Sequence, residues 1–255
     1  MNKTLYGFLC GLGAASIWGG MYVVSKVVLA IIPPFTLVTL RLLLGIMTLA
    51  IVVMMRGGLK ITRMQFLQVF GVGFVGYGIS LSLQFLGTKL STAANGSLVT
   101  SATPAFVLLF AWLLLSERIS ARKFFALLLA TLGVVAVIDP RSAQLNPNLF
   151  LGNILLLGAA VTWALYSVLV RKVTQNLDVL PFSLIAFMGG LPIVIPAGAW
   201  EVNTVGVGTI SLGVVGGVLF LGIISTALAM ILWNTAFAIL DAGAASLTFF
   251  AQPVV

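Results

Sequence analysis

Long apolar runs joined by short connections constrain the fold of this 255-residue chain more than any other feature. A helix of about 20 residues spans the hydrocarbon core of a bilayer, since each residue adds about 1.5 Å. Most of the runs reach that length, and the connections between them are too short to hold a separate soluble domain. We therefore expect membrane spans at residues 5–31, 35–55, 66–86, 92–115, 124–138, 149–170, 180–200, 210–240 and 242–255.

The backbone of these spans is expected to be helical. Hydrocarbon offers no partner to an unpaired peptide group, so only helices and closed barrels cross a bilayer. The apolar runs are continuous and do not alternate with polar residues, which excludes a β-barrel. Charged residues make up 7% of the chain, against about 25% in ordinary globular domains. The predicted fold class is an all-α polytopic membrane protein.

The cations lie singly or in pairs at the ends of the apolar runs, so the net charge of +8 does not form a basic face. We therefore expect no nucleic-acid partner. A cytoplasmic N-terminus would leave chiefly Lys89 and Arg141 outside. It would place the following cations inside: Lys3, Arg56, Lys60, Arg63, Arg118, Arg122, Lys123, Arg171 and Lys172. By the positive-inside rule, this asymmetry predicts that the N-terminus is cytoplasmic.

The chain contains an internal repeat. The stretch "AASIWGGMYVVSK" around Trp18 aligns with "AAVTWALYSVLVRK" around Trp163, an offset of 145 positions. The stretches that end at Pro104 and Pro253 align at an offset of 149. The first copy, residues 1–140, holds five expected spans, so the second copy, 147–255, enters the membrane with opposite polarity. Only the first copy continues beyond its proline, so we expect a ten-helix architecture whose last helix is missing here.

Aromatic and cationic residues gather at matching positions of the two copies. Trp18, Tyr22 and Lys26 lie broadly on one side of the first span, and Trp163 and Tyr166 occupy the same region of the sixth. One interpretation is a wall for a zwitterionic or anionic substrate. In the other, Lys26 extends to the outer interface and Trp18 only packs against neighbouring helices.

Arg41 lies two turns inside the second span, where a guanidinium is costly unless it is paired or faces water. No acidic residue lies within a span to pair with it. Arg41 is therefore either an anchor for backbone carbonyls or lipid phosphate at the outer rim, or a clamp for a substrate carboxylate.

Polar residues recur in repeat-matched spans. Each taken alone is expected to hydrogen-bond between helices, but their concentration favours a shared cavity. Pro104 and Pro253 remove backbone donors at equivalent depths, which predicts either a pair of gating kinks or kinks that serve packing alone. The polar residues are Tyr77, Gln84, Asn95, Ser101, Thr103, Trp233, Asn234 and Gln252.

Catalytic and cofactor-binding patterns are absent from the sequence. The chain has no histidine, no nucleotide-binding motif and no cluster of metal ligands, and its five acidic residues lie at the ends of spans. A membrane-embedded hydrolase or transferase needs such groups. We therefore expect no enzyme activity, no metal and no cofactor.

Three stretches resemble the EamA-type members of the drug/metabolite transporter superfamily. They are the "AxxWGxxYvxsK" pattern, "PPFTLVTLRLLLG", and "LSTAANGSLVTSATPAFVLLFAWLLLSERIS" with its echo "AASLTFFAQPVV". The resemblance covers both copies. It implies ten helices in two inverted five-helix units around a central cavity, and the movement of small metabolites such as amino acids, often outward.

These observations predict a secondary transporter that moves a small metabolite across the cytoplasmic membrane by alternating access. Its expected partners are a small-molecule substrate and the lipid bilayer. Small residues four apart, at Gly7 and Gly11 and at Gly213 and Gly217, permit close helix contact within one chain or in a homodimer. A lipid-carrier flippase of the same architecture and a membrane-embedded enzyme are the alternatives.

Overall fold

A computed structural model describes residues 2–117, 125, 128–129, 132 and 146–254. Seven of its helical segments are long and apolar enough to cross a membrane. Their ends lie within four residues of the ends expected for those spans. The segments are Lys3–Val28, Pro34–Met55, Arg63–Leu90, Ala93–Leu115, Pro147–Val173, Val179–Thr204 and Leu212–Ile239. The expected fifth span and residues Arg118, Arg122, Lys123 and Arg141 lie wholly or mainly outside the described residues.

Four segments are single α-helices, and the others change their winding along their length. Each copy has a π-helix within its third span and a change of winding in its fourth. The single helices are α1 (Lys3–Val28), α2 (Pro34–Met55), α9 (Pro147–Val173) and α10 (Val179–Thr204). The third spans are α3 (Arg63–Gly73), η1 (Phe74–Ser80) and α4 (Leu81–Leu90), and α11 (Leu212–Leu219), η2 (Phe220–Leu228) and α12 (Ala229–Ile239). The fourth are α5 (Ala93–Thr100) and α6 (Thr103–Leu115), and α13 (Ala242–Leu247) and η3 (Thr248–Val254).

Helix caps of the two copies recur at the repeat spacing. Thr92 caps the start of α5, where its hydroxyl accepts a hydrogen bond from the backbone N–H of Asn95. Asp241 caps the start of α13, where its carboxylate accepts one from the backbone N–H of Ala244. Both pairs are separated by 149 positions, the offset between Pro104 and Pro253. A side-chain acceptor at this position satisfies an otherwise unpaired amide of the first turn. The repeat seen in the sequence is therefore also a repeat of local structure.

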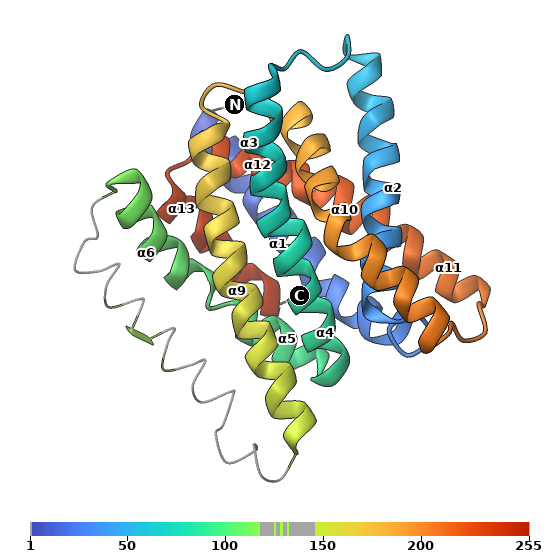
Figure 1. The fold of residues 1–255 in the computed structure, drawn as a ribbon. Coiled ribbons are helices and arrows are strands. Elements are labelled where there is room, and N and C mark those ends of the chain that lie inside the picture. The colour runs from blue at the N-terminus through green and yellow to red at the C-terminus, as the bar shows by residue number, and fades with distance from the viewer. Residues whose placement is uncertain (1, 118–124, 126–127, 130–131, 133–145, 255) are drawn as a thin grey trace.

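Helices of one copy pack against helices of the other. The most extensive contacts join α1 with α12, α4 with α9, and α2 with α10. In Figure 1 the N-terminus, the connection from α2 to α3 and the end of α9 lie at the same end of the molecule. The helices α1 and α9 therefore run in opposite directions, as an inverted repeat requires.

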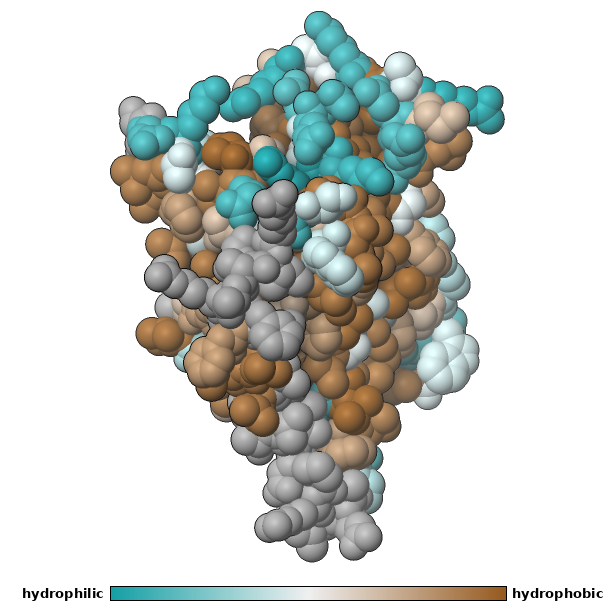
Figure 2. All heavy atoms as spheres, turned by 90° about the vertical axis from the view of Figure 1, so that its left-hand side faces the viewer, coloured by the Kyte–Doolittle hydropathy of each residue, from teal (hydrophilic) through white to brown (hydrophobic). Residues whose placement is uncertain are grey.

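The described surface suits a bilayer. Large apolar side chains are exposed along the helices, including Met47, Met54 and Trp112. Figure 2 shows a mainly hydrophobic flank below a hydrophilic end, which is the end that holds the N-terminus. In water, such an apolar surface would be an aggregation hazard, but in lipid it is the expected exterior. The chain is a multi-pass membrane protein.

Gly7 and Gly11 of α1 make close helix contacts within this chain. A Cβ at Gly7 would meet the Leu240 side chain, and a Cβ at Gly11 would meet the Thr248 hydroxyl at 2.5 Å. These glycines therefore let the ends of α12 and α13 approach α1 closely.

Candidate substrate cavity

A buried cavity lies between the two copies, near the middle of α1 and α9. Its volume is about 20 Å³, which is room for about one water molecule. Five residues singled out in the sequence line it: Trp18, Gln84, Thr103, Trp163 and Gln252. The other lining residues are Met21, Ser80, Leu81, Thr100, Ala159, Ala160, Met230 and Phe249.

Most of the lining comes in repeat-related pairs. Trp18 and Trp163 differ by 145 positions. Offsets of 149 relate three more lining pairs: Leu81 with Met230, Thr100 with Phe249, and Thr103 with Gln252. Equivalent residues of two inverted copies can face one cavity only if it lies close to the axis that relates the copies. The cavity is therefore at the centre of the inverted repeat.

Aromatic rings form much of the cavity wall. The Trp18 ring lies 5.6 Å from that of Trp163 in an edge-to-face arrangement, and 5.8 Å from the Phe249 ring. Trp233, a further residue proposed from the sequence, packs 5.3 Å behind Trp18. Such contacts hold the rings in fixed orientations, and the wall they form suits an apolar or aromatic ligand.

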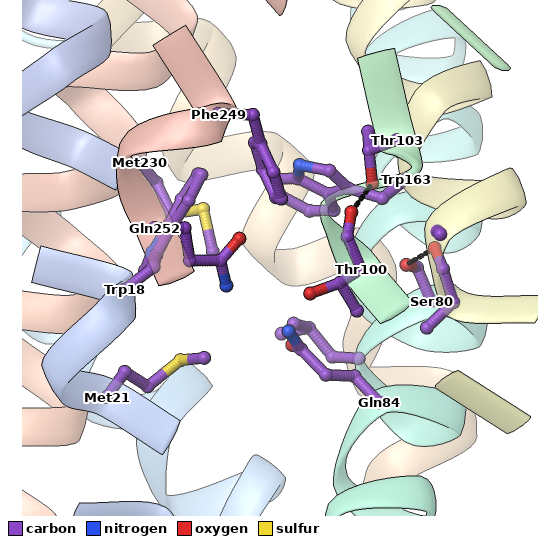
Figure 3. Close-up of a pocket in the computed structure, with 13 residues that line it drawn as sticks. Trp18, Met21, Ser80, Gln84, Thr100, Thr103, Trp163, Met230, Phe249 and Gln252 are labelled. Carbon is purple, nitrogen blue, oxygen red and sulfur yellow. Dashed lines mark hydrogen bonds between the residues drawn. The ribbon is translucent and has the colours of Figure 1, made fainter. Parts of the chain in front are cut away.

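Two polar side chains of the cavity are buried without hydrogen-bond partners. The Trp163 indole nitrogen and both amide atoms of Gln252 are unpaired within the part of the chain that the structure describes. In Figure 3 the Gln252 amide extends from η3 toward the open centre of the pocket. A buried polar group without a partner costs about 1–3 kcal/mol, so it is usually satisfied by water or a ligand. These atoms are candidate contacts for a bound molecule.

One polar network closes the cavity toward the C-terminal end of α1. The Gln84 amide donates to the Tyr22 hydroxyl at 2.6 Å, and the Tyr22 and Thr100 hydroxyls lie 2.9 Å apart. Tyr22 is 1% exposed, and its three-helix network joins α1, α4 and α5. We call Tyr22, Gln84 and Thr100 the first gate network.

A second network lies behind the cavity lining, toward the C-terminal end of α9. The hydroxyls of Tyr77 and Tyr166 lie 2.6 Å apart, and Tyr166 donates to the Asn234 carbonyl oxygen at 2.9 Å. The Asn234 amide donates in turn to Ser183 at 2.9 Å. Since α9 is antiparallel to α1, this second gate network, Tyr77, Tyr166, Asn234 and Ser183, lies on the other side of the cavity from the first.

Arg41 is completely buried and adjoins the cavity wall through Ser225. Its guanidinium donates to the Leu221 carbonyl at 3.3 Å, to the Thr226 hydroxyl at 3.0 Å and to the Ser225 hydroxyl at 3.3 Å, all in η2. The Trp18 indole nitrogen donates to the Ser225 carbonyl at 3.0 Å. Arg41 therefore braces the π-helix immediately behind Trp18, and it lies in the interior of the helix bundle.

Comparison with known proteins agrees with this architecture. The model of the EamA-like transporter family matches residues 5–138 and 150–255. The chain belongs to the EamA-like transporter family. A solved structure aligns with 96% of the chain, and the chain covers 84% of that structure. The TM-score is 0.70 at 20% sequence identity, so the two share a fold.

Several relatives of this family member carry transporter names. An uncharacterized transporter of Archaeoglobus fulgidus is 26% identical over 93% of the chain and 82% of its own length. An uncharacterized transporter of Bacillus subtilis, YyaM, is 23% identical over 99% of the chain and 84% of its own length. A protein of Salmonella typhimurium named a probable amino-acid metabolite efflux pump is 30% identical over 67% of the chain and 54% of its own length.

Two residues proposed for the transporter's site lie away from the cavity. The Lys26 ammonium donates to the backbone carbonyls of Thr88, Lys89 and Ser91 at the end of α4. Asn95, in the first turn of α5, donates to the Asn153 side chain at 3.3 Å. Both contacts join helix ends, and neither Lys26 nor Asn95 lines the cavity.

The two prolines lie beside changes of winding. Pro104 is in the first turn of α6, directly after the interruption between α5 and α6, and Pro253 lies in the 3₁₀ helix η3. Thr103 and Gln252, the residues before them, both line the cavity. The local distortion at each proline therefore adjoins the candidate site.

Reasoning from sequence did not propose Met21, Thr100, Met230 and Phe249 as site residues, although all four line the cavity. Helical spacing could have found two of them, because Thr100 and Phe249 lie one turn before Thr103 and Gln252. Met21 and Met230 carry no polar signal in an apolar span, so nothing in the sequence separates them from residues that face lipid.

Proposed function

We propose that the protein is a secondary transporter that moves a small metabolite across the cytoplasmic membrane by alternating access. The observation that carries this proposal is the cavity on the axis of the inverted repeat, with unpaired polar atoms of Trp163 and Gln252 in its wall. Transporters built from inverted repeats bind substrate at this place, between the copies and near the bilayer midplane.

The small size of the cavity supports a mechanism in which two gates open in turn. A volume of about 20 Å³ is far below the roughly 300 Å³ of an ordinary small-molecule site, so the cavity must widen before a metabolite can bind. A metabolite enters only when one gate network separates. Opening the first gate network requires α1 to move from α4 and α5, and opening the second requires η1 and α9 to move from α12. Rocking one copy against the other would separate Tyr77 of the first copy from Tyr166 of the second. The first gate network joins helices of the first copy alone, so it opens by a movement of α1 within that copy.

The proposed substrate class includes amino acids and related compounds, and the proposed direction is outward. The name of the Salmonella relative, a probable amino-acid metabolite efflux pump, supports both. The aromatic wall of Trp18, Trp163 and Phe249, beside the polar atoms of Gln252, suits a molecule with an apolar part and a polar group.

Solute counterflow in proteoliposomes tests the function. We expect a panel of amino acids and related acids to show ATP-independent exchange of at least one member. Trp163→Phe keeps an aromatic ring but removes the unpaired N–H, and should lower the exchange rate about tenfold. Trp112→Phe makes the same change at a ring that is 52% exposed on the lipid-facing surface, and should leave the rate unchanged. Equal rates in the two variants would remove Trp163 from the site.

The proposed orientation has its own test. The N-terminus, Lys60 and Lys172 should all be cytoplasmic under the positive-inside rule. Cys10 is the only cysteine and is buried, so single-cysteine variants Lys60→Cys and Lys172→Cys in a Cys10→Ala background can be labelled separately. Both should react with an impermeant maleimide only from the cytoplasmic side. Labelling from opposite sides would exclude the proposed topology.

A further inference from the structure

The positive charge of Arg41 is buried without a negative partner. Its side chain is 0% exposed, and no carboxylate contacts it within residues 2–117 and 146–254. The Glu201 carboxylate accepts from the amide and hydroxyl of Thr36, and Glu117 accepts from the Ala242 amide. The partners of Arg41 are one carbonyl and two hydroxyl groups, all of them neutral.

The guanidinium also has a free donor. Its Nη1 atom is buried without a hydrogen-bond partner. A charge removed from water is costly unless it is paired, and a charge-assisted hydrogen bond is about twice as strong as a neutral one. The arrangement therefore lacks an anion at this position, and the Phe85 ring face 4.6 Å from the guanidinium carbon only partly compensates for it.

Hydrogen bonds connect Arg41 to the cavity wall. Ser225 joins the two sites, since its hydroxyl accepts from Arg41 and its carbonyl accepts from Trp18, a lining residue. Arg41 itself lies behind the lining residues. The described lining holds no acidic side chain, while Trp163 contributes an unpaired N–H. In a medium of low dielectric constant a buried charge acts beyond its own hydrogen-bond partners. A cavity with one neighbouring cation and no carboxylate favours a ligand of net negative charge.

We propose that the transported molecule is an apolar or aromatic monocarboxylate of net charge −1, whose carboxylate compensates the buried charge of Arg41. This proposal rests on the proposed function and specifies its substrate class. The rings of Trp18, Trp163 and Phe249 would hold the apolar part. An amino-acid zwitterion would bring an ammonium group for which the described lining has no carboxylate.

Three ligands of nearly equal shape separate charge from size: 3-phenylpropanoate, phenylalanine and 3-phenylpropanamide. Their net charges at pH 7 are −1, 0 and 0. We expect calorimetric titration of the purified protein to show that the carboxylate binds roughly 10 to 100 times more tightly than the amide, the effect of losing a hydrogen bond to a charged group. Equal affinity for the carboxylate and the amide, or no binding of the carboxylate, would overturn the proposal without any variant.

Variants then assign the preference to Arg41. Arg41→Met should abolish the preference for the carboxylate over the amide, and Arg41→Lys should keep it because the charge remains. Lys60→Gln removes the same formal charge from an exposed position and should keep the preference. A preference that survives in Arg41→Met would exclude Arg41 as its source. If Arg41→Met does not fold, the proposal is tested by the wild-type affinities for the carboxylate and the amide and by the preference of Arg41→Lys. Loss of the preference in a folded Arg41→Lys would contradict the proposal.

Counterflow separates the failure of this proposal from failure of the proposed function. If phenylalanine is exchanged across the bilayer and 3-phenylpropanoate is not, the protein is a transporter and the anion inference is wrong. If 3-phenylpropanoate binds with the expected preference but no member of the panel is exchanged, the binding inference holds and the transport function is wrong.

Discussion

Two repeat-related helix crossings share a topology but differ in chemistry. The second span of each copy crosses the third span of the other, α10 against η1 and α2 against η2. In the first crossing, backbones touch, because a Cβ on Gly73 would overlap the Ala186 carbonyl and a Cβ on Gly189 would overlap that of Phe70. In the second, the counterpart of Gly73 is Gly222, which faces the Leu44 side chain.

The difference between the crossings centres on one residue. At the offset of 145, the position of Ala186 in α10 corresponds to Arg41 in α2. Ala186 permits backbone contact, whereas Arg41 holds η2 through side-chain hydrogen bonds to Leu221, Ser225 and Thr226. A backbone contact leaves little freedom for movement, and a set of polar side-chain contacts can rearrange. The inverted repeat therefore preserves the scaffold, while a buried cation braces only one of the two crossings.

The largest expected effect is a loss of stability when the close backbone contact between α3 and α10 is disrupted. Gly73→Ala places a methyl group against backbone atoms, so we expect a loss of about 3 kcal/mol in unfolding free energy. Gly222→Ala meets only the flexible Leu44 side chain, with its nearest atom at 2.6 Å, and should lose about 1 kcal/mol. The gain in helix propensity from glycine to alanine is common to both and cancels. Denaturant unfolding in detergent measures the difference.

Gly20→Ala is the control for the glycine pair. No heavy atom lies within 4 Å of the position that a Cβ would occupy at Gly20, so this variant should be stabilised by about 0.5–1 kcal/mol. Equal losses for Gly73→Ala and Gly222→Ala would show that the two crossings are equally tight, which would contradict the comparison.

A smaller effect is expected from the repeat-related tryptophans. Trp18 donates its indole N–H to Ser225, whereas the indole N–H of Trp163 is unpaired. Substitution by phenylalanine removes the same atoms at both sites, so Trp18→Phe should cost about 1 kcal/mol more stability than Trp163→Phe. Thermal unfolding of the two variants in one detergent measures this difference. A larger loss for Trp163→Phe would indicate that its N–H has a structural partner.

The sequence was sufficient for the architecture because lipid imposes a simple rule. Spans of the required length must be helical, and two offsets, 145 and 149, related the copies. The odd number of spans expected in the first copy then predicted their inversion. The interior of each span was harder to predict. The π-helices at Phe74–Ser80 and Phe220–Leu228 pack against α10 and α2 of the opposite copy, and hydropathy reports neither the winding nor these contacts.

The candidate site was partly predictable for the same reason. Trp18, Gln84 and Trp163 were found because polar or aromatic groups are conspicuous in an apolar span. Lys26 was equally conspicuous, but the structure places its ammonium at three backbone carbonyls, a contact that a sequence pattern cannot distinguish from substrate binding. For Arg41, the sequence left an anchor and a clamp open because the choice depends on which residues of η2 surround it.

The smallest expected effect is local and compares the two helix-end cations. Lys26 donates to carbonyls at the end of α4, and Arg171 donates to the carbonyls of Phe237 and Ala238 at the end of α12, at 3.4 and 2.9 Å. Lys26→Met and Arg171→Met retain the apolar stem but remove these donors, so each should cost about 1 kcal/mol or less. Because the copies are inverted, the two losses should appear at opposite ends of the molecule.

Hydrogen exchange can measure the two losses separately, because the last turns of α4 and α12 end in equivalent backbone hydrogen bonds. Ser91 donates to Gly87 and Leu240 donates to Ala236, both at 2.8 Å and 149 positions apart. Lys26→Met should speed exchange at Ser91 and leave Leu240 unchanged, and Arg171→Met should do the reverse. Lys26 bonds three carbonyls and Arg171 two, so the acceleration at Ser91 should be the larger. Acceleration of both amides in either variant would show that the ends are coupled through the bundle, which would contradict a local effect.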